Sequence, residues 1–240
     1  ADLPFLKANK TSKATRRPSP VVANFPSIIW PDCSPPRLKL FFFIISFTYL
    51  SPTFDLKNLI LQVKEKKIHG INVTVPFKKA VIPYLDKLTT ESENTQSVNT
   101  IYLEDDKIVG HNTDINGFEL SIKRSKFDLF NKKVFILGAG GVVPSIIYAL
   151  NKMKVSKIFI SNRTKEKAEN LKNFFNDITV IEWGEVPDFD MIINATSLGL
   201  KKEDEINLDF SSIDKNKLFY DVIYNPKETS FLKTGKNLGN

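Results

Sequence analysis

A continuous apolar run that ends in a glycine turn constrains this chain more than any other feature. The run KVFIL, at residues 133–137, is typical of a strand buried on both faces of a parallel sheet. The turn GAGG, at residues 138–141, follows at once, and an apolar segment of helical length occupies residues 142–150. Glycines at this place let the backbone approach a pyrophosphate at the N-terminus of the following helix. Strand, turn and helix together predict a Rossmann-like dinucleotide-binding domain.

The turn departs from the full GxGxxG pattern, because Val143 occupies the site of the third glycine. We expect the turn to bind its ligand nonetheless, with the helix and the strand slightly further apart than usual. A tight turn in an α/β fold that binds no nucleotide is the alternative.

The residues after the next expected strand, 157–161, indicate the kind of dinucleotide. NAD enzymes place an acidic residue here, on the ribose hydroxyls. This chain has Asn162, Arg163 and Thr164 instead, with Lys167 close by. A guanidinium suits a 2′-phosphate, which a carboxylate would repel, so we expect NADP rather than NAD. An exposed arginine without a ligand is the alternative.

A second polar cluster begins in the segment GINVTVPFKK, residues 70–79. Its alternating part predicts a strand, and Pro76 suits the first position of a helix, where its missing N–H has no partner anyway. We therefore expect the chain to turn from strand into helix and to carry Lys78 over the carboxyl end of the strand, where ligands bind in open α/β sheets. A surface lysine beside Lys79 is the alternative.

Two further polar clusters, SVNT at residues 97–100 and GHNTD at residues 110–114, each stand at the end of a short β-like run. An acidic tripeptide separates these two runs, which predicts a hairpin. We expect this hairpin to deliver Asp114 to the same face as Lys78.

The remaining elements are predicted from the period of the apolar residues. Apolar residues recur at helical spacing between Leu56 and Ile68. We also expect helices over residues 80–82, 118–126 and 164–175, strands over residues 98–103, 107–111, 191–194 and 218–222, and a loop over residues 89–97.

In these motifs the sequence resembles shikimate dehydrogenase. The family shows NVTxPxK, a VNT segment and GxNTDxxG in this order, and the chain carries all three, the last closed by Gly117. Three further family motifs follow, NRT at residues 162–164, NATSxG at residues 194–199 and YDxxYNPxxTxFL at residues 220–232. The resemblance covers roughly residues 54–240.

The resemblance implies an α/β fold, in which an N-terminal α/β substrate domain precedes a Rossmann-like NADP-binding domain with a parallel sheet. We expect these domains at residues 51–117, where the substrate domain is incomplete, and 118–240, after an atypical segment at residues 1–50. The implied activity is that of an NADP-dependent oxidoreductase acting on a CH–OH group. It reduces 3-dehydroshikimate to shikimate, reversibly and with NADPH, in chorismate and aromatic amino acid biosynthesis.

For the site, the resemblance implies a catalytic pair of Lys78 and Asp114, with Thr74, Asn99 and Tyr224 on the substrate. Oxidising an alcohol requires a proton acceptor on the hydroxyl while hydride leaves its carbon. Which member of the pair takes the proton stays open, because a nearby carboxylate favours the charged form of a lysine whereas a base must be neutral. The residues expected to bind the cofactor are Gly138, Ala139, Gly140, Gly141, Val142, Asn162, Arg163, Thr164, Lys167, Thr196, Ser197 and Val222.

Both ends of the chain depart from the family pattern. The family's SxSP segment, whose serines hold the substrate carboxylate, has no counterpart here. The chain ends at Asn240, before the family's glycine-rich segment and the helix with a substrate-binding glutamine. Charge-assisted hydrogen bonds are worth about 1.5 to 3 kcal/mol each. We therefore expect substrate binding, and with it the activity of this chain, to be impaired.

Residues 1–37 are rich in Pro, Ser and Lys, and three origins stay open for them: an organellar transit segment, a disordered tail, or sequence foreign to the domain. We hypothesise that residues 1–50 do not derive from the normal reading of the family's first unit. The apolar run at residues 41–50 is too short for a bilayer, which needs about 20 helical residues. A buried strand or a malformed segment is expected there.

Composition excludes several classes of protein. Cys33 is the one cysteine, which allows no intrachain disulfide and fits a reducing, cytoplasmic setting, and two histidines are too few for a histidine-based metal site. Of the net charge of +7, residues 1–40 contribute +5, without a recognised nucleic-acid motif. We therefore expect no metal, no nucleic acid and no membrane, and the family resemblance implies a small-molecule substrate, with a homodimer as the candidate assembly.

Two other functions stay open. One is an NAD-using quinate/shikimate dehydrogenase. The other is a non-catalytic NADP-binding module, in which residues 132–232 fold and the first unit does not.

Overall fold

The computed structural model describes residues 42–45, 55–201 and 203–240, and for residues 42–45 the backbone alone. Every described element belongs to one compact unit of the chain. The expectations for residues 1–50 therefore lie outside the described residues, apart from one short strand inside the apolar run, where a strand is one of the two alternatives.

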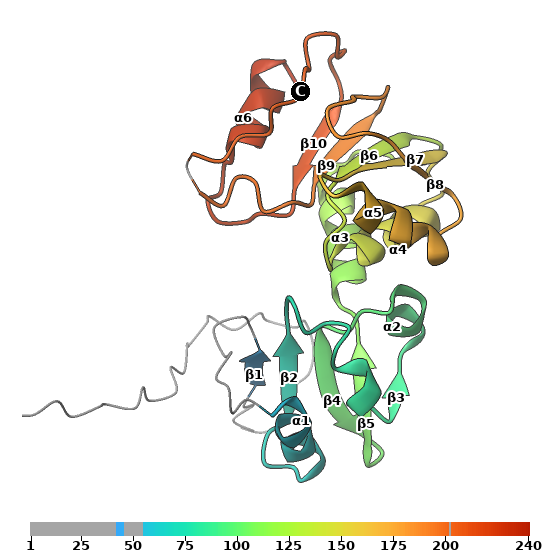
Figure 1. Ribbon diagram of the computed structural model, residues 1–240, viewed down its shortest axis with the longest axis vertical. Helices are drawn as coiled ribbons and strands as arrows, with labels where there is room; N and C mark the ends of the chain where they lie inside the picture. Colours follow the sequence, from blue (N-terminus) through green and yellow to red (C-terminus); the bar gives the residue numbers. More distant parts are fainter. Residues whose placement is uncertain (1–41, 46–54, 202) are drawn as a thin grey trace, which may run out of the picture. The chain divides into compact units, whose positions relative to one another are not determined.

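The first half of the described chain builds a mixed, five-stranded sheet (Figure 1). Its order is β1-β2-β4-β5-β3, in which β4 and β5 form the predicted antiparallel hairpin and β1 runs parallel to β2. Asp105 and Asp106 turn the hairpin at φ 49° and 59°, the left-handed pair that a tight turn needs. The strands span β1 Phe42–Ile45, β2 Gly70–Val73, β3 Lys87–Leu88, β4 Thr100–Glu104 and β5 Lys107–His111.

Helix α1, Leu56–Lys64, forms where the apolar period predicts it. Asp55 caps it by accepting two backbone N–H groups of the first turn, and Ile60 and Val63 pack into the core of the first sheet.

A carboxylate binds to the backbone of strand β5. The Asp86 side chain accepts the backbone N–H of Ile108 in β5, and this hydrogen bond holds the pKa of Asp86 below its usual value.

The prediction that a helix starts at Pro76 is wrong. The chain makes hydrogen-bonded turns instead and then forms the 3₁₀ helix η2, Ile82–Tyr84, where the short helix over residues 80–82 is expected. Only six residues separate Pro76 from Pro83, and Pro83 disfavours α-helical backbone in the residue before it. The segment is therefore too short to nucleate an α-helix.

The prediction of a loop over residues 89–97 is also incomplete, because the segment contains α2, Thr90–Thr95. The Thr89 hydroxyl caps this helix by accepting the N–H of Ser92, and Glu91 and Glu93 lie in its first turn, where carboxylates suit the helix dipole. The capping pattern favours a helix, although the polar composition favours a loop.

The second half of the described chain builds a wholly parallel, five-stranded sheet in the order β10-β9-β6-β7-β8. From β6 the chain runs outward through β7 and β8 and then returns to the other side of β6 with β9 and β10. The direction in which successive strands are added to the sheet reverses between β6 and β9. Doubly wound sheets bind dinucleotides at such a switch point. The strands span β6 Lys133–Leu137, β7 Lys157–Ser161, β8 Ile178–Val180, β9 Met191–Asn194 and β10 Leu218–Asp221. The predicted α/β fold with a Rossmann-like sheet is confirmed.

Helices cover both faces of this sheet (Figure 1). Val134 and Ile136 of β6 pack in one core with residues of α3 and α4, whereas Phe135 and Leu137 pack in the other core with Phe231 of α6. The helices span α3 Asp114–Ser125, α4 Val143–Lys152, α5 Lys165–Glu169 and α6 Ser230–Asn237, with the 3₁₀ helix η3 at Asn170–Asn173.

Several bounds in this half differ from the prediction. The α-helical part of residues 164–175 ends at Glu169 and continues as η3, which carries two asparagines of low helix propensity. Helix α3 begins at Asp114 rather than at residue 118, and β3, β8 and α6 are elements that the periodicity does not predict. The domain boundary placed at residue 117 falls within α3 and stays a prediction.

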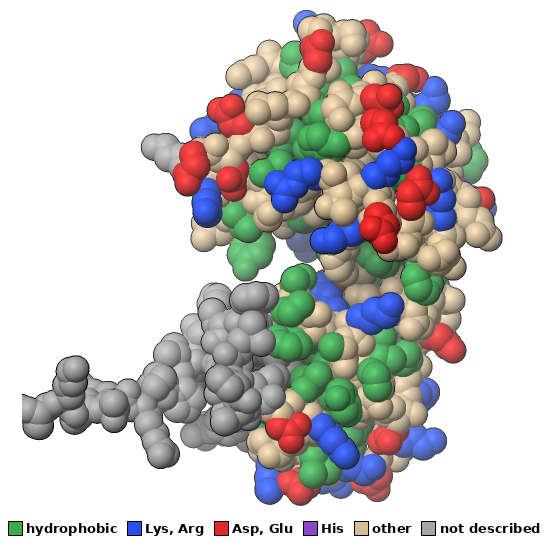
Figure 2. Space-filling view, viewed as in Figure 1, with side chains coloured by type: hydrophobic (Ala, Val, Ile, Leu, Met, Phe, Trp, Pro, Cys, Tyr) green, Lys and Arg blue, Asp and Glu red, His purple; other side chains and the backbone are tan. Residues whose placement is uncertain are grey.

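Charges of both signs are mixed on the face shown in Figure 2, where Lys and Arg side chains lie among Asp and Glu side chains. That face therefore offers no continuous basic patch among the described residues. Among those residues, no helix combines the length and the apolar character that crossing a bilayer requires.

The burial of Ile136 predicts how its truncation would change the free energy of unfolding. Ile136 is 0% exposed between β6 and the helices α3 and α4, so Ile136→Ala should leave a cavity and lower the free energy of unfolding by about 2–5 kcal/mol. Leu120→Ala, at a side chain 54% exposed on α3, is the matched control and should change it by less than about 0.5 kcal/mol. Urea unfolding followed by circular dichroism measures both, and equal effects would contradict the described core.

Candidate active site

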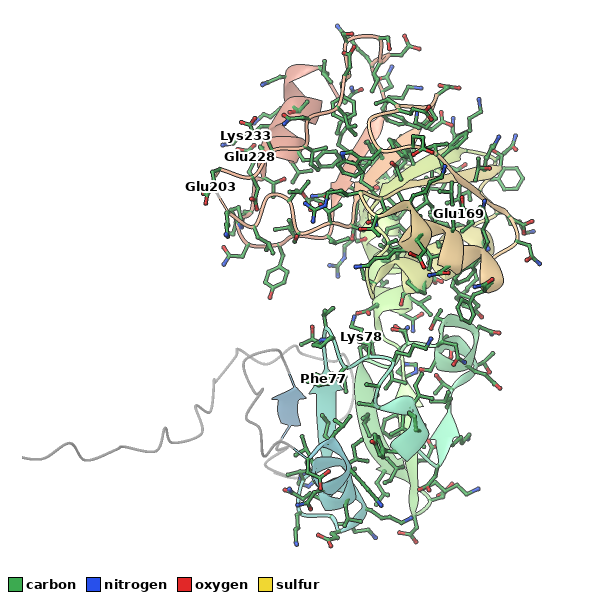
Figure 3. All side chains as sticks on the ribbon, in the orientation of Figure 1. Phe77, Lys78, Glu169, Glu203, Glu228 and Lys233 are labelled. Atoms are coloured by element: carbon green, nitrogen blue, oxygen red, sulfur yellow. The ribbon has the colours of Figure 1, made fainter. Side chains whose placement is uncertain are left out.

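An ion pair between two distant segments forms the centre of the candidate site. Lys78 Nζ donates to Asp114 Oδ2 over 2.7 Å, and the two side chains are 13% and 24% exposed. Lys78 lies in the turns that follow β2, as Figure 3 shows, and Asp114 is the first residue of α3. A short ion pair that is largely withdrawn from water is stronger than an exposed one. The two groups that could act together on an alcohol thus lie within one hydrogen bond of each other.

Asn99 holds the other carboxylate oxygen. Its Nδ2 donates to Asp114 Oδ1 and to Thr113 Oγ1, each over 2.8 Å, and its Oδ1 accepts the Thr113 N–H over 2.9 Å. The two oxygens of Asp114 therefore have different partners, an amide on one side and an ammonium on the other. This arrangement fixes the plane of the carboxylate.

Backbone hydrogen bonds hold the segments that carry these side chains. The N–H of Val98 donates to the carbonyl of Lys78 over 2.9 Å, and the N–H of Asn99 donates to the carbonyl of His111 over 3.1 Å. Lys78 is thereby tied to the segment before β4, and Asn99 to the end of β5. These two bonds bring the three polar clusters together.

Asn112 sets the start of helix α3. Its Oδ1 accepts the backbone N–H of Asp114 over 3.0 Å, and its Nδ2 donates to Thr95 Oγ1 and Ser145 Oγ over 3.1 and 2.8 Å. Asp114 stands in the first turn of the helix, where the dipole stabilises a carboxylate.

Two of the expected substrate residues are not part of this hydrogen-bonded cluster. The carbonyl of Thr74 accepts the N–H of Phe77 over 2.9 Å, and the Thr74 side chain is half-buried. Tyr224 is 88% exposed, and its hydroxyl has no hydrogen-bond partner among the described residues. Of the five residues expected to act on the substrate, the structure brings together Lys78, Asn99 and Asp114.

The glycine turn contains one position at which any side chain is strained. Gly138 has φ +108°, and a Cβ built there would lie 2.7 Å from the carbonyl oxygen of Ala195. The close approach arises because the N–H of Gly138 donates to Ser161 while the N–H of Ala195 donates to Leu137, each over 2.8 Å. Backbone hydrogen bonds thus hold the start of the turn between Ser161, at the end of β7, and Ala195, just after β9.

The rest of the turn fits a pyrophosphate. A Cβ at Gly140 would have its nearest neighbour, the Ala195 carbonyl oxygen, at 3.8 Å, which is ordinary van der Waals contact without a clash. The N–H groups of Gly140, Gly141 and Val142 have no acceptor among the described residues. Unpaired N–H groups at the start of α4 are the donors that bind phosphate oxygens. Ala139 is half-buried, and Val143 is 0% exposed in the core, where its larger side chain is accommodated.

The loop after β7 presents free positive charge. Arg163 and Lys167 are exposed and have no ion-pair partner among the described residues, whereas Lys165 pairs with Glu182. Asn162 Nδ2 donates to the Thr164 carbonyl over 2.7 Å, which shapes the loop. Arg163 and Lys167 are therefore both available to a 2′-phosphate.

A buried amide organises the loop after β9. Asn194 is 0% exposed, and its Nδ2 donates to the Leu198 carbonyl and to the Asp221 carboxylate, which also accepts the Thr229 hydroxyl over 2.6 Å. The Asn194 Oδ1 accepts the Thr196 hydroxyl over 2.7 Å. The expected cofactor residues Thr196, Ser197 and Val222 lie on the two segments that this network joins, and the Val222 N–H donates to the Asn194 carbonyl.

Four structurally important residues have no role predicted from the sequence, although three of them stand within the motifs: Asn112, Asn194, Ser145 and Asp221. A signal was present, because amides and carboxylates directly beside buried strand ends need internal partners. The partners themselves come from other elements and cannot be found from local pattern.

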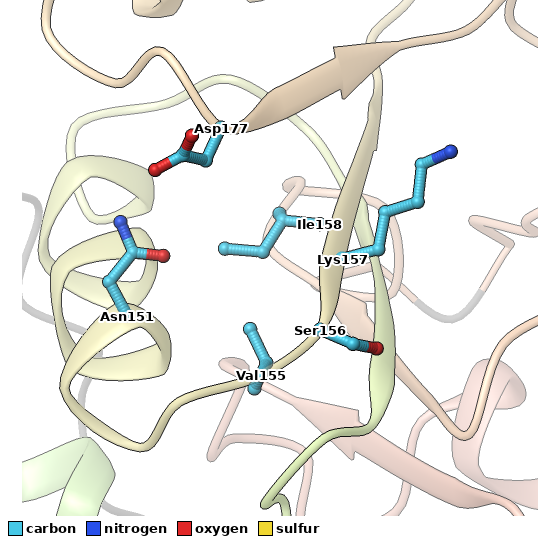
Figure 4. A pocket seen from close by; sticks show the side chains of 6 residues that line it. All are labelled: Asn151, Val155, Ser156, Lys157, Ile158 and Asp177. Atoms are coloured by element: carbon cyan, nitrogen blue, oxygen red, sulfur yellow. The ribbon is translucent and has the colours of Figure 1, made fainter.

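Two further hollows lie away from these residues. One, of about 310 Å³, is lined by Asn151 and Asp177 and by residues 155–158 at the amino end of β7 (Figure 4). The glycine turn follows the carboxyl end of the parallel strand β6, so this hollow lies at the opposite edge of the sheet. Among the described residues, no group of three or more His, Cys, Asp or Glu side chains could hold a metal ion.

Comparisons with protein families give two matches. The description of the first is shikimate dehydrogenase substrate binding domain, over residues 45–101, and that of the second is shikimate / quinate 5-dehydrogenase, over residues 121–222.

Individual relatives agree with these families. The chain is 58% identical over 185 residues to the shikimate dehydrogenase (NADP(+)) of Pelagibacter ubique, covering 77% of this chain and 70% of the relative. It is 37% identical over 196 residues to that of Nitrosopumilus maritimus, covering 78% and 71%.

Among solved structures, shikimate dehydrogenase from Aquifex aeolicus is 38% identical at a TM-score of 0.71, covering 81% of this chain and 70% of that one. Quinate dehydrogenase from Corynebacterium glutamicum, in complex with NAD, is 28% identical at a TM-score of 0.72, covering 78% and 70%.

The geometry of the turn predicts different costs for two neighbouring substitutions. Gly138→Ala places a Cβ against the Ala195 carbonyl at positive φ and should lower the free energy of unfolding by about 1–3 kcal/mol. Gly140→Ala, whose Cβ would make only an ordinary van der Waals contact at 3.8 Å, should change it by less than about 0.5 kcal/mol. Urea unfolding of both variants tests this, and a Gly138→Ala protein as stable as Gly140→Ala would refute the close approach.

Proposed function

The chain belongs to the shikimate dehydrogenase family, and from this premise we propose that Lys78 and Asp114 carry out the reaction of that family, the reversible NADPH-dependent reduction of 3-dehydroshikimate to shikimate. The observation that carries the proposal is the 2.7 Å ion pair between the two side chains, largely withdrawn from water. The identity with relatives named shikimate dehydrogenase (NADP(+)) supports both the reaction and the cofactor.

The reaction needs a proton at the oxygen whenever a hydride moves at the carbon. In the direction of reduction, the ammonium of Lys78 donates a proton to the substrate oxygen as the carbonyl becomes an alcohol. In the direction of oxidation, the pair takes the hydroxyl proton back. Lys78 and Asp114 share a hydrogen bond, so the two act as one proton-exchanging unit.

Asn99 keeps the pair in place during proton transfer. Its amide occupies Asp114 Oδ1, so Oδ2 stays directed at Lys78 Nζ. An amide that also contacts a neighbouring substrate hydroxyl would orient the reacting carbon relative to the pair. In this proposal, Thr74 and Tyr224 add further substrate contacts, Tyr224 from its exposed position after β10.

The parallel sheet provides the cofactor site. The free N–H groups of Gly140, Gly141 and Val142 would bind the pyrophosphate, and Arg163 with Lys167 would bind the 2′-phosphate. The segments organised by Asn194 and Asp221 would face the nicotinamide with Thr196, Ser197 and Val222. When bound, the nicotinamide supplies or accepts the hydride.

The cellular setting is part of the same proposal. The reaction places the protein in aromatic amino acid biosynthesis. A single cysteine in the sequence supports a reducing, cytoplasmic location. A homodimer stays a prediction.

Substitutions of the ion pair test the assignment. Lys78→Ala and Asp114→Asn should each lower kcat for shikimate oxidation by about 10²–10⁴-fold, because proton transfer is lost. The dissociation constant of NADP should change by less than about threefold, since neither group contacts the cofactor phosphates in the proposal.

The control for these substitutions is Lys79→Ala, at the exposed neighbouring lysine, which should retain nearly the wild-type kcat. The rise of NADPH absorbance with purified protein measures the rates, and fluorescence titration measures NADP binding. An Asp114→Asn protein with wild-type kcat would exclude the proposed pair.

The choice of cofactor depends on Arg163. Arg163→Ala should weaken NADP binding by about tenfold or more, which corresponds to one lost charge-assisted hydrogen bond, and should leave NAD binding unchanged. Lys157→Ala removes one positive charge from the other end of β7 and serves as the control. Titration of NADP and NAD against the wild type, Arg163→Ala and Lys157→Ala tests the alternative of an NAD-using enzyme. In that case Arg163→Ala would weaken the binding of neither cofactor. Comparing shikimate with quinate as substrate completes that distinction.

A further inference from the structure

A chain of buried polar side chains leads away from the carboxylate of Asp114. Asn112 is 0% exposed and uses its whole amide, with Oδ1 on the Asp114 N–H at 3.0 Å and Nδ2 on Thr95 Oγ1 and Ser145 Oγ at 3.1 and 2.8 Å. Thr95 and Ser145 are 4% and 0% exposed. The Thr95 hydroxyl donates its hydrogen bond to the Glu91 carbonyl over 2.6 Å, so it can act only as an acceptor towards Asn112.

Stability alone does not account for such a network. A buried hydrogen bond adds little net free energy of folding, and each of these groups loses its hydration on burial. The three hydrogen bonds of the Asn112 side chain instead fix the plane of its amide group. Because Oδ1 of this amide accepts the N–H of Asp114, the plane of the amide determines the position of the Asp114 backbone, from which the carboxylate side chain extends.

The far end of the network lies beside the glycine turn. Ser145 is in the first turn of α4, four residues after Gly141. The same region makes two longer contacts with the substrate half, from Ser97 Oγ to the Gly141 carbonyl and from Asn94 Nδ2 to the Tyr148 hydroxyl, each at 3.5 Å. Of the three links, the one through Asn112 is short, buried and joined to the reacting carboxylate.

We propose that Asn112 is a positioning residue that orients Asp114 and, through Ser145, makes this orientation depend on the place of helix α4. The inference rests on the proposed function, in which Asp114 exchanges the proton and α4 begins at the turn that holds the cofactor. A shift of α4 upon cofactor binding is then transmitted to the carboxylate by two hydrogen bonds, from Ser145 to Asn112 and from Asn112 to Asp114.

Ser145→Ala tests this with little risk to folding, because alanine is a good helix former and the removed group is one oxygen. The variant takes away an acceptor of Asn112 and leaves Asn112, Asp114 and Lys78 in place. We expect kcat for shikimate oxidation to fall by about five- to tenfold, the effect of one hydrogen bond. The KM values for shikimate and NADP should stay within about twofold, since no ligand contact is removed.

Thr95 provides a second variant pair. Thr95→Val removes the other acceptor and should lower kcat in the same way, whereas Thr95→Ser keeps the hydroxyl and should restore it. Ser121→Ala is the matched control: its hydroxyl lies on the same helix as Asp114 but bonds to the Phe118 carbonyl and the Tyr220 hydroxyl, at 2.7 and 3.0 Å. This control should keep the wild-type kcat.

Hydrogen exchange gives a readout that does not depend on activity. In the free protein, Ser145→Ala should accelerate exchange of the Asp114 amide, because Asn112 Oδ1 no longer holds it firmly, and Ser121→Ala should not. If the wild-type protein lacks activity with shikimate and NADP but exchange responds as expected, the network is supported and the proposed function fails. If the wild-type protein is active and Ser145→Ala changes neither kcat nor the exchange of this amide, the inference is overturned. A lower kcat without faster exchange would overturn it as well.

Discussion

The ion pair between Lys78 and Asp114 is the interaction on which the rest of the site depends. Each of these groups is largely withdrawn from water, and a charge in that position is costly unless an opposite charge lies against it. The pair therefore requires the turns after β2 and the start of α3 to meet at one point. The β4–β5 hairpin satisfies this requirement, because its polar ends carry Asn99 on one side and Asn112 to Asp114 on the other.

The parallel sheet depends on a different constraint, the close approach of two backbones. Gly138 lies against the carbonyl of Ala195 because the strands β6, β7 and β9 run side by side and their ends exchange hydrogen bonds. The N–H groups of Gly140, Gly141 and Val142, at the start of α4, have no acceptor among the described residues. Free donors at this position, beside the exposed Arg163, are why the sheet is suited to an anionic dinucleotide.

Local pattern determines the parts of this structure that could be predicted. Strand β6 is found residue for residue, since a continuous apolar run before a glycine turn has few other solutions, and the hairpin follows from two β-like runs around an acidic turn. The six motifs in their order identify the family, which the comparisons confirm. The helix expected at Pro76 is wrong because a second proline follows too soon. The partner of Asn112 could not be predicted, because Ser145 reaches it only through the packing of α4.

Helix α3 unites two environments. It begins at Asp114, yet Phe118 and Ile122 bury its next turns in the core of the parallel sheet, together with Ile136. The residues around Lys78 are anchored elsewhere, since Phe77 and Val81 pack into the core of the mixed sheet. The two members of the ion pair are thus anchored in different hydrophobic cores. A shift of α3 relative to the turns after β2 would therefore lengthen the 2.7 Å hydrogen bond between Lys78 Nζ and Asp114 Oδ2, so the register between the two cores sets the geometry of the ion pair.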